Sequence, residues 1–333
     1  MGAVAFAVVA IVVALAVRGG DGDGASVSST ADGSFDPGDD VYDAFEDDEV
    51  SLVCIEELRL LCEDAFPSLG FDVRIESVWT TVDRLEAGGA LDADAWLTVR
   101  PFDDLARAAG ADLLPSSAVL ARSPIAIIGS KEAVTAFDAT CGDATVLLTC
   151  AATDGRADVV LRDPATSAIG ALALASVADE LGATTERLPG TVETIEALLA
   201  DGRIAQVPYE DAERAGGTLV ALTIEAELLA AIEDLTYEEQ DVYDDAAIRY
   251  PLDVRAVEVV AVTGATAMRA QDVQAVLASE DVGYSYRRTG YTVDGDASYL
   301  LDYAVPFADR PTVRTDLPPP SVELLQALRG GRR

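Results

Sequence analysis

From residue 50 onward, short runs rich in β-branched residues alternate with segments of helical periodicity, and this alternation limits the fold more than any other feature. Val50–Ile55 is predicted to be a strand, and residues 56–66 are predicted to form a helix with its apolar side chains on one face. Strands at 72–77 and 94–98 and helices at 80–87 and 102–109 are expected next. Repeated strand–helix units predict an α/β fold with mostly parallel sheets and helices on both faces.

The same alternation continues in the second half of the chain and predicts a second lobe. An apolar run at 118–129 is interrupted at residues 122–124, and Asp163-Pro164 is expected to open a long helix at 164–181. The acidic segment 237–245 is expected to be a surface loop. A chain of 333 residues exceeds the usual size of one domain, so two lobes are expected. The other predicted elements are helices at 130–137, 191–200, 209–215, 225–234, 270–279 and 321–329, and strands at 158–161, 204–207, 218–223 and 254–262.

Charge and composition exclude several classes of function. The formal net charge is −36, and a field of that sign repels phosphate backbones, so a nucleic-acid partner is not expected. The chain contains no histidine, which excludes Ser-His-Asp and Cys-His catalysis and any histidine metal site. No phosphate-binding glycine motif is present, and no pair of carboxylates is singled out for acid–base work. We therefore expect neither an enzyme, nor a metal site, nor a cofactor.

An apolar N-terminal segment predicts export. Residues 3–17 are continuously apolar and match the hydrophobic region of a signal sequence, with an Ala-x-Ala-like site at residues 14–16. No Lys or Arg precedes this run, and Arg18 follows it, which argues against simple cleavage. We expect residues 1–18 to be an uncleaved signal-anchor, a transmembrane helix that holds an extracellular body at the cell membrane. The alternative is a cleaved signal peptide and a secreted protein.

Residues 19–49 are rich in Gly, Ser, Asp and Glu and contain no Lys or Arg. Such a segment cannot bury enough apolar surface to order itself, and its like charges extend it. It is therefore expected to be an acidic disordered linker between the membrane segment and the folded body.

Four cysteines form two close pairs in the sequence, Cys54 with Cys62 and Cys141 with Cys150. An even number of cysteines in an exported chain predicts disulfides, although four cysteines allow three connectivities. The short spacing within each pair favours local bonds. A thiolate metal site or a redox pair is the weaker alternative, because the chain has no Cys-x-x-Cys motif.

Several segments, taken in order, resemble the type II periplasmic-binding-protein superfamily, the extracellular solute-binding proteins of transporters. The strand–helix opening is similar to the start of lobe 1, and the Leu161–Gly170 segment (LRDPATSAIG) is similar to the turn that opens lobe 2. The order and spacing of the segments carry the resemblance, which covers about residues 50 to 290. The five segments are 53–58 (VCIEEL), 92–97 (DADAWL), 120–128 (LARSPIAII), 161–170 and 250–252 (YPL).

The resemblance implies two α/β lobes that are joined by two crossovers and close on a ligand. Lobe 1 would comprise residues 50–123 and 251–317, lobe 2 residues 124–250, and the C-terminal tail residues 318–333. The N-terminal segment and its linker are similar to those of membrane-anchored members. The implied partners are a small-molecule ligand of unknown class and a membrane permease or another cell-envelope protein.

Candidate ligand contacts follow from the strand ends, because ligands bind beyond the carboxyl ends of parallel strands, where helix N-termini present free N–H groups. Trp79 is expected to be a stacking platform or a packing aromatic, and Arg100 an oxyanion contact or a surface ion pair. Ser167 is expected to bind an anion or to cap its own helix. The complete set of candidates is Trp79, Arg100, Ser123, Thr166, Ser167 and Tyr209, with Ser77, Val78, Thr98 and Glu210 beside them.

Two hypotheses of different classes follow. The first is a membrane-anchored solute-binding protein that captures a small ligand between its lobes. The alternative is the same scaffold used as a ligand-free extracellular interaction or sensory domain. Glu56 and Glu57 at the expected cleft mildly favour the alternative, because two carboxylates there disfavour an anionic ligand. The preferred interpretation of the two glutamates is that they are first-turn acids that compensate the dipole of their own helix.

Overall fold

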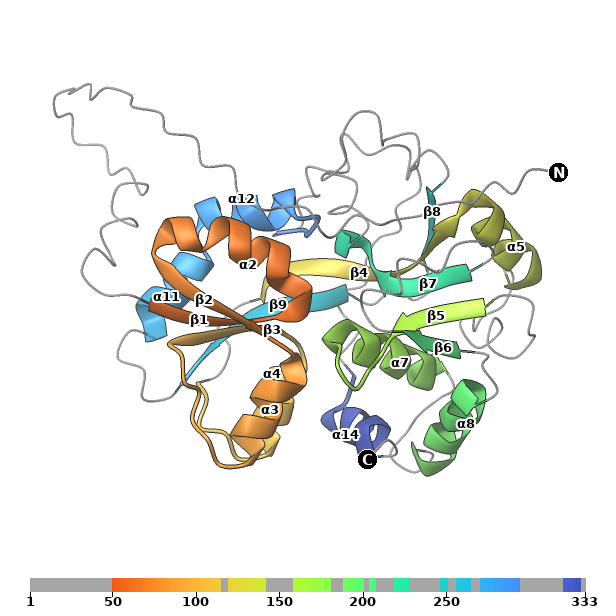
Figure 1. Ribbon diagram of the computed structural model, residues 1–333, viewed down its shortest axis with the longest axis horizontal. Coiled ribbons are helices and arrows are strands. Elements are labelled where there is room, and N and C mark those ends of the chain that lie inside the picture. Colours follow the sequence, from red (N-terminus) through yellow and green to blue (C-terminus); the bar gives the residue numbers. More distant parts are fainter. Residues whose placement is uncertain are drawn as a thin grey trace, which may run out of the picture.

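The computed structural model describes residues 50–114, 119–141, 158–180, 188–200, 204–207, 219–227, 246–250, 256–264, 270–293 and 320–330. Two α/β lobes lie side by side, and the long strands β4 (Val119–Ser130) and β9 (Ala256–Thr263) run between them (Figure 1). The expected membrane segment and acidic linker, residues 1–49, lie outside the described residues. Within the described part of the chain, no helix is long and apolar enough to cross a membrane.

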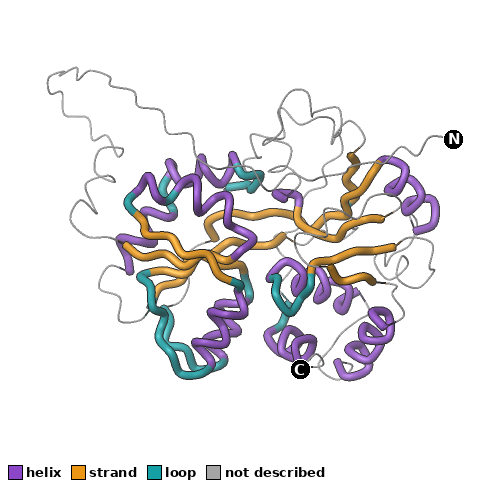
Figure 2. Tube along the Cα trace, in the orientation of Figure 1, coloured by secondary structure: helices purple, strands orange, loops and turns teal. Residues whose placement is uncertain are grey.

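Lobe 1 is built on a short parallel sheet with helices on both faces. Strand β1 (Val50–Ile55) lies between β2 (Phe71–Glu76) and β3 (Ala95–Val99) and is parallel to both. Figure 2 shows this band of strands with helices above and below it. Trp96 and Phe102 are fully buried in its core. The helical elements are η2 (Glu56–Leu58), α2 (Arg59–Ala65), η3 (Pro67–Leu69), α3 (Val78–Glu86), α4 (Phe102–Ala108), α11 (Ala270–Leu277) and α12 (Glu280–Arg288).

Lobe 2 repeats this plan with β5 (Asp158–Arg162) between β6 (Ile204–Val207) and β7 (Leu219–Ile224), again in parallel. Helix α7 (Ala168–Glu180) is buried along most of its length, as expected for a helix that is apolar on nearly all sides. The remaining elements are α5 (Lys131–Cys141), α8 (Leu188–Ala200) and β8 (Ala246–Arg249), and the C-terminal helix α14 (Val322–Gly330) packs beside α7 and α8.

Strand β4 belongs to both sheets. Its first half pairs antiparallel with β9, from Val119 to Pro124, and its second half pairs antiparallel with β7, from Ile125 to Gly129. Strand β8 adds to the second half on its other side. The sheet order is β2-β1-β3-β9-β4-β7-β5-β6, so among the described strands β4 joins the sheets of the two lobes. The expected α/β class is confirmed, and the antiparallel pairs lie where the chain passes between lobes.

Several predicted elements differ from the structure. The apolar run at 118–129 is one unbroken strand, because Pro124 lies at the last position where β4 pairs with β9. The helix expected from residue 164 begins at Ala168, since residues 163–167 form a turn closed by hydrogen bonds to Asp163. Helix α12 was not predicted, although Ser279 caps it and its ends carry acids first and arginines last.

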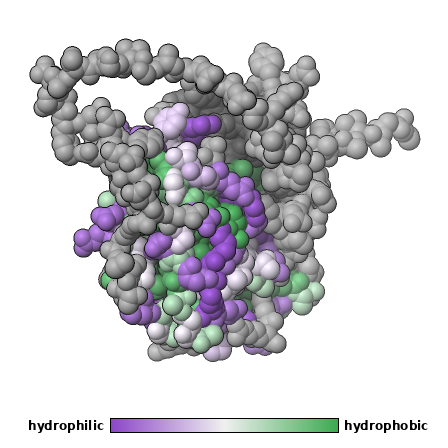
Figure 3. All heavy atoms as spheres, turned by 60° about the vertical axis from the view of Figure 1, so that its left-hand side comes forward, coloured by the Kyte–Doolittle hydropathy of each residue, from purple (hydrophilic) through white to green (hydrophobic). Residues whose placement is uncertain are grey.

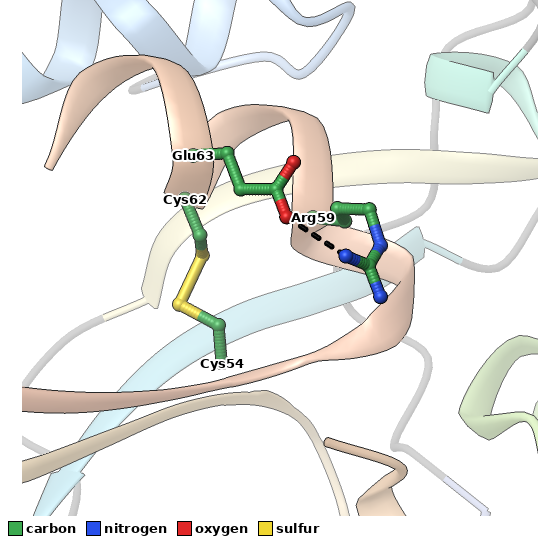
Figure 4. Close-up of a disulfide and its surroundings, with 4 residues drawn as sticks. All are labelled: Cys54, Arg59, Cys62 and Glu63. Carbon is green, nitrogen blue, oxygen red and sulfur yellow. Dashed lines mark hydrogen bonds and ion pairs between the residues drawn. A yellow bond between two sulfur atoms is a disulfide. The ribbon is translucent and has the colours of Figure 1, made fainter. Parts of the chain in front are cut away.

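The predicted local disulfide between Cys54 and Cys62 is present and joins the end of β1 to α2 (Figure 4). Arg59 and Glu63, on the same helix, form an ion pair of 2.8 Å between Nη1 and Oε1. Cys141 is also disulfide-bonded, whereas Cys150 lies outside the described residues. The bond at Cys54 fixes the start of α2 against the strand end that leads into the interlobe region.

Gly170 allows α7 to lie against the carboxyl end of β5. A Cβ at this position would be 2.2 Å from the carbonyl oxygen of Arg162 and 2.8 Å from its carbonyl carbon. Both of these are backbone atoms, so neither can move aside cheaply. The first turn of α7 is therefore held beside the turn that follows β5.

We expect Gly170→Ala to lower the free energy of unfolding by about 1–3 kcal/mol, the usual cost of overpacking a tight contact. Gly190→Ala in α8 is the matched control, because a Cβ added there would meet no neighbouring atom within 4 Å and alanine favours a helix. Chemical denaturation of both variants gives the comparison. Equal stability of the two would contradict the proposed contact.

Candidate functional site

The carboxyl ends of the parallel strands in the two lobes meet across the boundary between them. In lobe 1, β1 leads into Glu57, and β2 leads into Ser77 and Trp79. In lobe 2, β5 leads into the turn 163–168. Side chains of the first group form hydrogen bonds with the second, so we define these residues together as the interlobe site. This is the edge at which open α/β sheets bind their ligands.

Glu57 makes the most extensive contact between the lobes. Its Oε1 accepts hydrogen bonds from Ser167 Oγ at 2.7 Å and from the backbone N–H of Ala168 at 2.6 Å. The N–H of Ile169 lies 3.4 Å from the same oxygen. A carboxylate of lobe 1 thus lies at the N-terminus of a lobe 2 helix, where exposed N–H groups favour negative charge.

Ser77 and Trp79 add two contacts to the same turn. Ser77 Oγ donates to the carbonyl oxygen of Thr166 at 2.9 Å, and Trp79 Nε1 donates to the carbonyl oxygen of Pro164 at 2.7 Å. Ser77 also caps α3 by accepting from the N–H of Trp79. The ring of Trp79 is buried and meets Phe102 edge to face, with centroids 5.1 Å apart.

The turn 163–168 is preorganised by its own hydrogen bonds. The Asp163 carboxylate accepts from the N–H of Ala165 at 2.9 Å, and its carbonyl oxygen accepts from the N–H of Ser167 at 2.8 Å. Ser167 caps α7 by accepting from the N–H of Gly170 at 3.0 Å. Because Asp and Ser side chains stabilise turns and helix starts, the sequence itself fixes this part of the site.

The C-terminal helix α14 adds a cation to the lobe 1 side of the boundary. Arg329 lies over the ring of Trp79, with its guanidinium carbon 4.3 Å from the centroid, and pairs with Asp83 on α3. Helix α14 contacts α7 and α8 of lobe 2 and α4 of lobe 1. It therefore bridges the lobes on the side where α3 and α4 lie (Figure 1).

Two charged clusters lie on or directly after strands of the two lobes. In lobe 1, Glu258 pairs with Arg100 at 3.2 Å and with Arg122 at 3.1 Å. In lobe 2, Arg162 at the end of β5 is buried and pairs with Glu227 at 2.9 Å. Each arginine is held by a carboxylate, so both clusters orient cations near the boundary.

Buried polar groups lie where the chain crosses from one lobe to the other. Ser123 in β4 is fully buried, and its hydroxyl accepts from the N–H of Ala226 at 2.9 Å. Tyr250, just after β8, donates its hydroxyl to Glu225, which is also fully buried. Both points at which the chain approaches the other lobe thus have hydrogen bonds that fix their geometry.

The structure brings together some of the predicted site residues and separates others. Trp79, Thr166 and Ser167 meet in the interlobe site together with Ser77. Arg100 lies in the ion-pair cluster with Glu258, Ser123 lies where the chain crosses between the lobes, and Thr98 is buried within β3. Tyr209 and Glu210 lie outside the described residues.

The partners of two important residues were not predicted from the sequence. Glu56 and Glu57 do lie in the first turn of their own helical element, as predicted, but Glu57 also lies at the N-terminus of α7, and Glu56 pairs with Arg59. Arg329 was placed at the end of a short predicted helix in the C-terminal tail, and no contact was predicted for it. The absence of an acidic residue from the first turn of α7 is a sequence signal that could have indicated a carboxylate partner for that helix.

The described residues contain no group of three or more His, Cys, Asp or Glu side chains that could hold a metal ion. What the interlobe site offers is a set of hydrogen-bond donors and acceptors, one aromatic ring and the N-terminus of a long helix. Groups of these kinds can hold polar or charged molecules.

Comparisons with known proteins agree with this geometry. No family model and no curated protein matches the sequence. Among solved structures, a periplasmic thiamin binding protein matches with a TM-score of 0.58 and 12% identity over 86% of this chain and 96% of the other. FutA2 from Synechocystis PCC6803 matches with a TM-score of 0.56 and 14% identity, over 85% of this chain and 96% of its own.

A third structure is the periplasmic binding protein AfuA from Actinobacillus pleuropneumoniae with fructose-6-phosphate, at a TM-score of 0.55 and 11% identity, covering 85% of this chain and 95% of that one. Identities this low show the fold alone. The chain has the two-lobe fold of the type II periplasmic binding proteins, as the sequence resemblance predicted.

The contact of Arg329 leads to a prediction about stability. We expect Arg329→Met to lower the free energy of unfolding by about 1 kcal/mol, because the substitution removes a largely buried cation together with its contact to an aromatic face and its ion pair. Arg59→Met is the matched control: that side chain is 41% exposed, against 15% for Arg329, and pairs only within its own lobe. Denaturant titrations of the two variants check this.

The control is expected to stay within about 0.5 kcal/mol of the parent chain, as exposed ion pairs usually do. A loss at Arg59 as large as the loss at Arg329 would show that α14 adds no particular contact to the boundary.

Proposed function

We propose that the chain is an extracellular solute-binding protein that captures a small ligand between its two lobes and passes it to a membrane permease. The observation that carries this proposal is the meeting of Ser77, Trp79 and the turn 163–168 at the facing carboxyl ends of the parallel strands. A molecule held there would contact both lobes at once, which is what couples ligand binding to hinge closure.

The chemistry of the interlobe site supports binding rather than reaction. Backbone and side-chain groups at the start of α7 can hydrogen-bond a polar ligand, and Trp79 can contact an apolar or aromatic portion of it. The solved structures of similar fold are described as binding proteins, for thiamin and fructose-6-phosphate among others. Because these ligands differ widely, the fold alone does not fix the ligand of this chain.

The same fold also supports the alternative of a ligand-free interaction domain. Glu57 binds the N–H groups of α7 that an anionic ligand would otherwise use. If this carboxylate is a permanent partner of α7, the two lobes form one rigid surface and bind no small molecule. The response to ligands distinguishes the two proposals.

We expect the full chain to show a ligand-dependent rise in melting temperature when it is screened against thiamin, polyamines, iron citrate, sugar phosphates and amino acids. Ser167→Ala is expected to reduce the response, since it removes a hydroxyl from the interlobe site. Ser176→Ala is the matched control, because that hydroxyl bonds within α7 to the carbonyl of Leu172. A flat response of the parent chain to the whole panel would favour the interaction domain.

We also propose that residues 1–18 anchor the protein in the cell membrane and that residues 19–49 are a tether to the extracellular body. The continuous apolar run of residues 3–17 and the acidic composition after it support this proposal. The full chain is then expected in the membrane fraction after an alkaline carbonate wash. A variant that lacks residues 1–18 provides the comparison, and recovery of the full chain in the wash would contradict the proposal.

A further inference from the structure

The two lobes hold each other through side chains that belong to the chain itself. Among the described residues, the contacts that cross the boundary include those of Glu57 with the start of α7, of Ser77 and Trp79 with the turn 163–168, and of α14 with α4. None of these three contacts involves a residue of β4. Rotation of the lobes about β4 would break them together.

Glu57 is the strongest of these contacts because its interaction is charge-assisted. One carboxylate oxygen accepts from both Ser167 Oγ and the N–H of Ala168, at distances of 2.7 and 2.6 Å. Hydrogen bonds to an ionised acceptor are about twice as strong as those between neutral groups. Helix α7 has no acidic residue in its own first turn, so Glu57 also supplies the negative charge that this helix end favours.

Helix α14 holds the boundary from a second direction. It packs against α7 and α8 in lobe 2, while its Arg329 pairs with Asp83 and lies over Trp79 in lobe 1. The indole of Trp79 in turn donates to Pro164 of lobe 2. Arg329, Trp79 and Pro164 thus form a continuous connection from the C-terminal helix, through lobe 1, back to lobe 2.

From these contacts we propose that Glu57 is the central residue of an interlobe latch. We use this term for the set of contacts within the chain that keeps the two lobes together in the absence of solute. The inference deepens the proposed function, because it concerns the regulation of the same interlobe site. A solute must first displace Glu57 from α7, and the strength of the latch therefore sets how readily the site opens. Helix α14 supports the closed arrangement because it packs against both lobes.

The two neighbouring glutamates provide a matched pair of variants that tests the role of Glu57. Glu57→Gln keeps the size of the side chain and removes its charge, which weakens both interlobe hydrogen bonds. Glu56→Gln is the control, since Glu56 is the neighbouring carboxylate in the same turn but pairs with Arg59 inside lobe 1. Only the first substitution is expected to free lobe 2.

The distance between the lobes is the measurement that tests the latch. Spin labels are placed in the full chain at Ala108→Cys on α4 and Glu196→Cys on α8, which are both exposed. Dipolar spectroscopy without added solute is expected to give one short distance for the parent and for Glu56→Gln. For Glu57→Gln we expect a longer distance whose population rises roughly tenfold or more, as the loss of a charge-assisted contact implies.

An unchanged distance in Glu57→Gln would overturn the latch, and so would a parent chain that is already open. Circular dichroism shows whether the variant is folded. If it is not, Trp79→Phe and Arg329→Met test the same device, because each removes one connection across the boundary and keeps the apolar bulk of its side chain. Opening in these two variants supports the latch, and distances equal to the parent contradict it.

The latch and the proposed function can fail independently. A flat melting-temperature screen combined with opening of Glu57→Gln would overturn only the solute-binding proposal. A ligand that raises the melting temperature, combined with an unchanged distance in Glu57→Gln, would overturn only the latch.

Discussion

The antiparallel pairing of β4 with partners from both sheets is the constraint on which the rest of the structure depends. Residues up to Pro124 pair with β9, and residues from Ile125 onward pair with β7, so one strand belongs to two lobes. This continuous strand fixes which strand ends face each other. Every contact of the interlobe site, from Glu57 to the turn 163–168, follows from that alignment.

The electrostatics of the boundary contrast with the acidity of the whole chain. The net charge of the chain is −36, but at and near the interlobe site single carboxylates have defined partners. Glu57 meets the N-terminus of α7, Glu258 holds two arginines, and Glu227 pairs with Arg162. Figure 3 shows hydrophobic residues lying between hydrophilic ones on one face of the molecule. In the described part of the chain, only Leu60 and Tyr284 are large exposed hydrophobics.

Local sequence patterns predicted much of the fold because the spacing of apolar residues within a segment indicates whether that segment is a strand or a helix. Strand β1 and strand β6 were predicted with the observed bounds, and Ser77, Trp79, Thr166 and Ser167 were placed at the correct strand ends. Helix α7 was predicted to begin at Pro164, where proline also suits a turn, and the hydrogen bonds to Asp163 decide between these two structures. Arg100 was predicted to be either an oxyanion contact or part of an ion pair. The structure shows that it pairs with Glu258 on β9.

The sequence by itself determined the α/β alternation, because periodicity acts along the chain. Chain length and the resemblance predicted two lobes, and the short spacing of Cys54 and Cys62 favoured the local disulfide that the structure contains. Only the tertiary structure decided that Glu57 binds α7 and that Arg329 lies over Trp79. In each case the partner lies in a distant part of the sequence, and Glu57 and Ala168 are 111 residues apart. Such pairings depend on how β4 aligns the lobes and how α14 returns to them. A helix end attracts any carboxylate that is near it, and the fold alone selects which one that is.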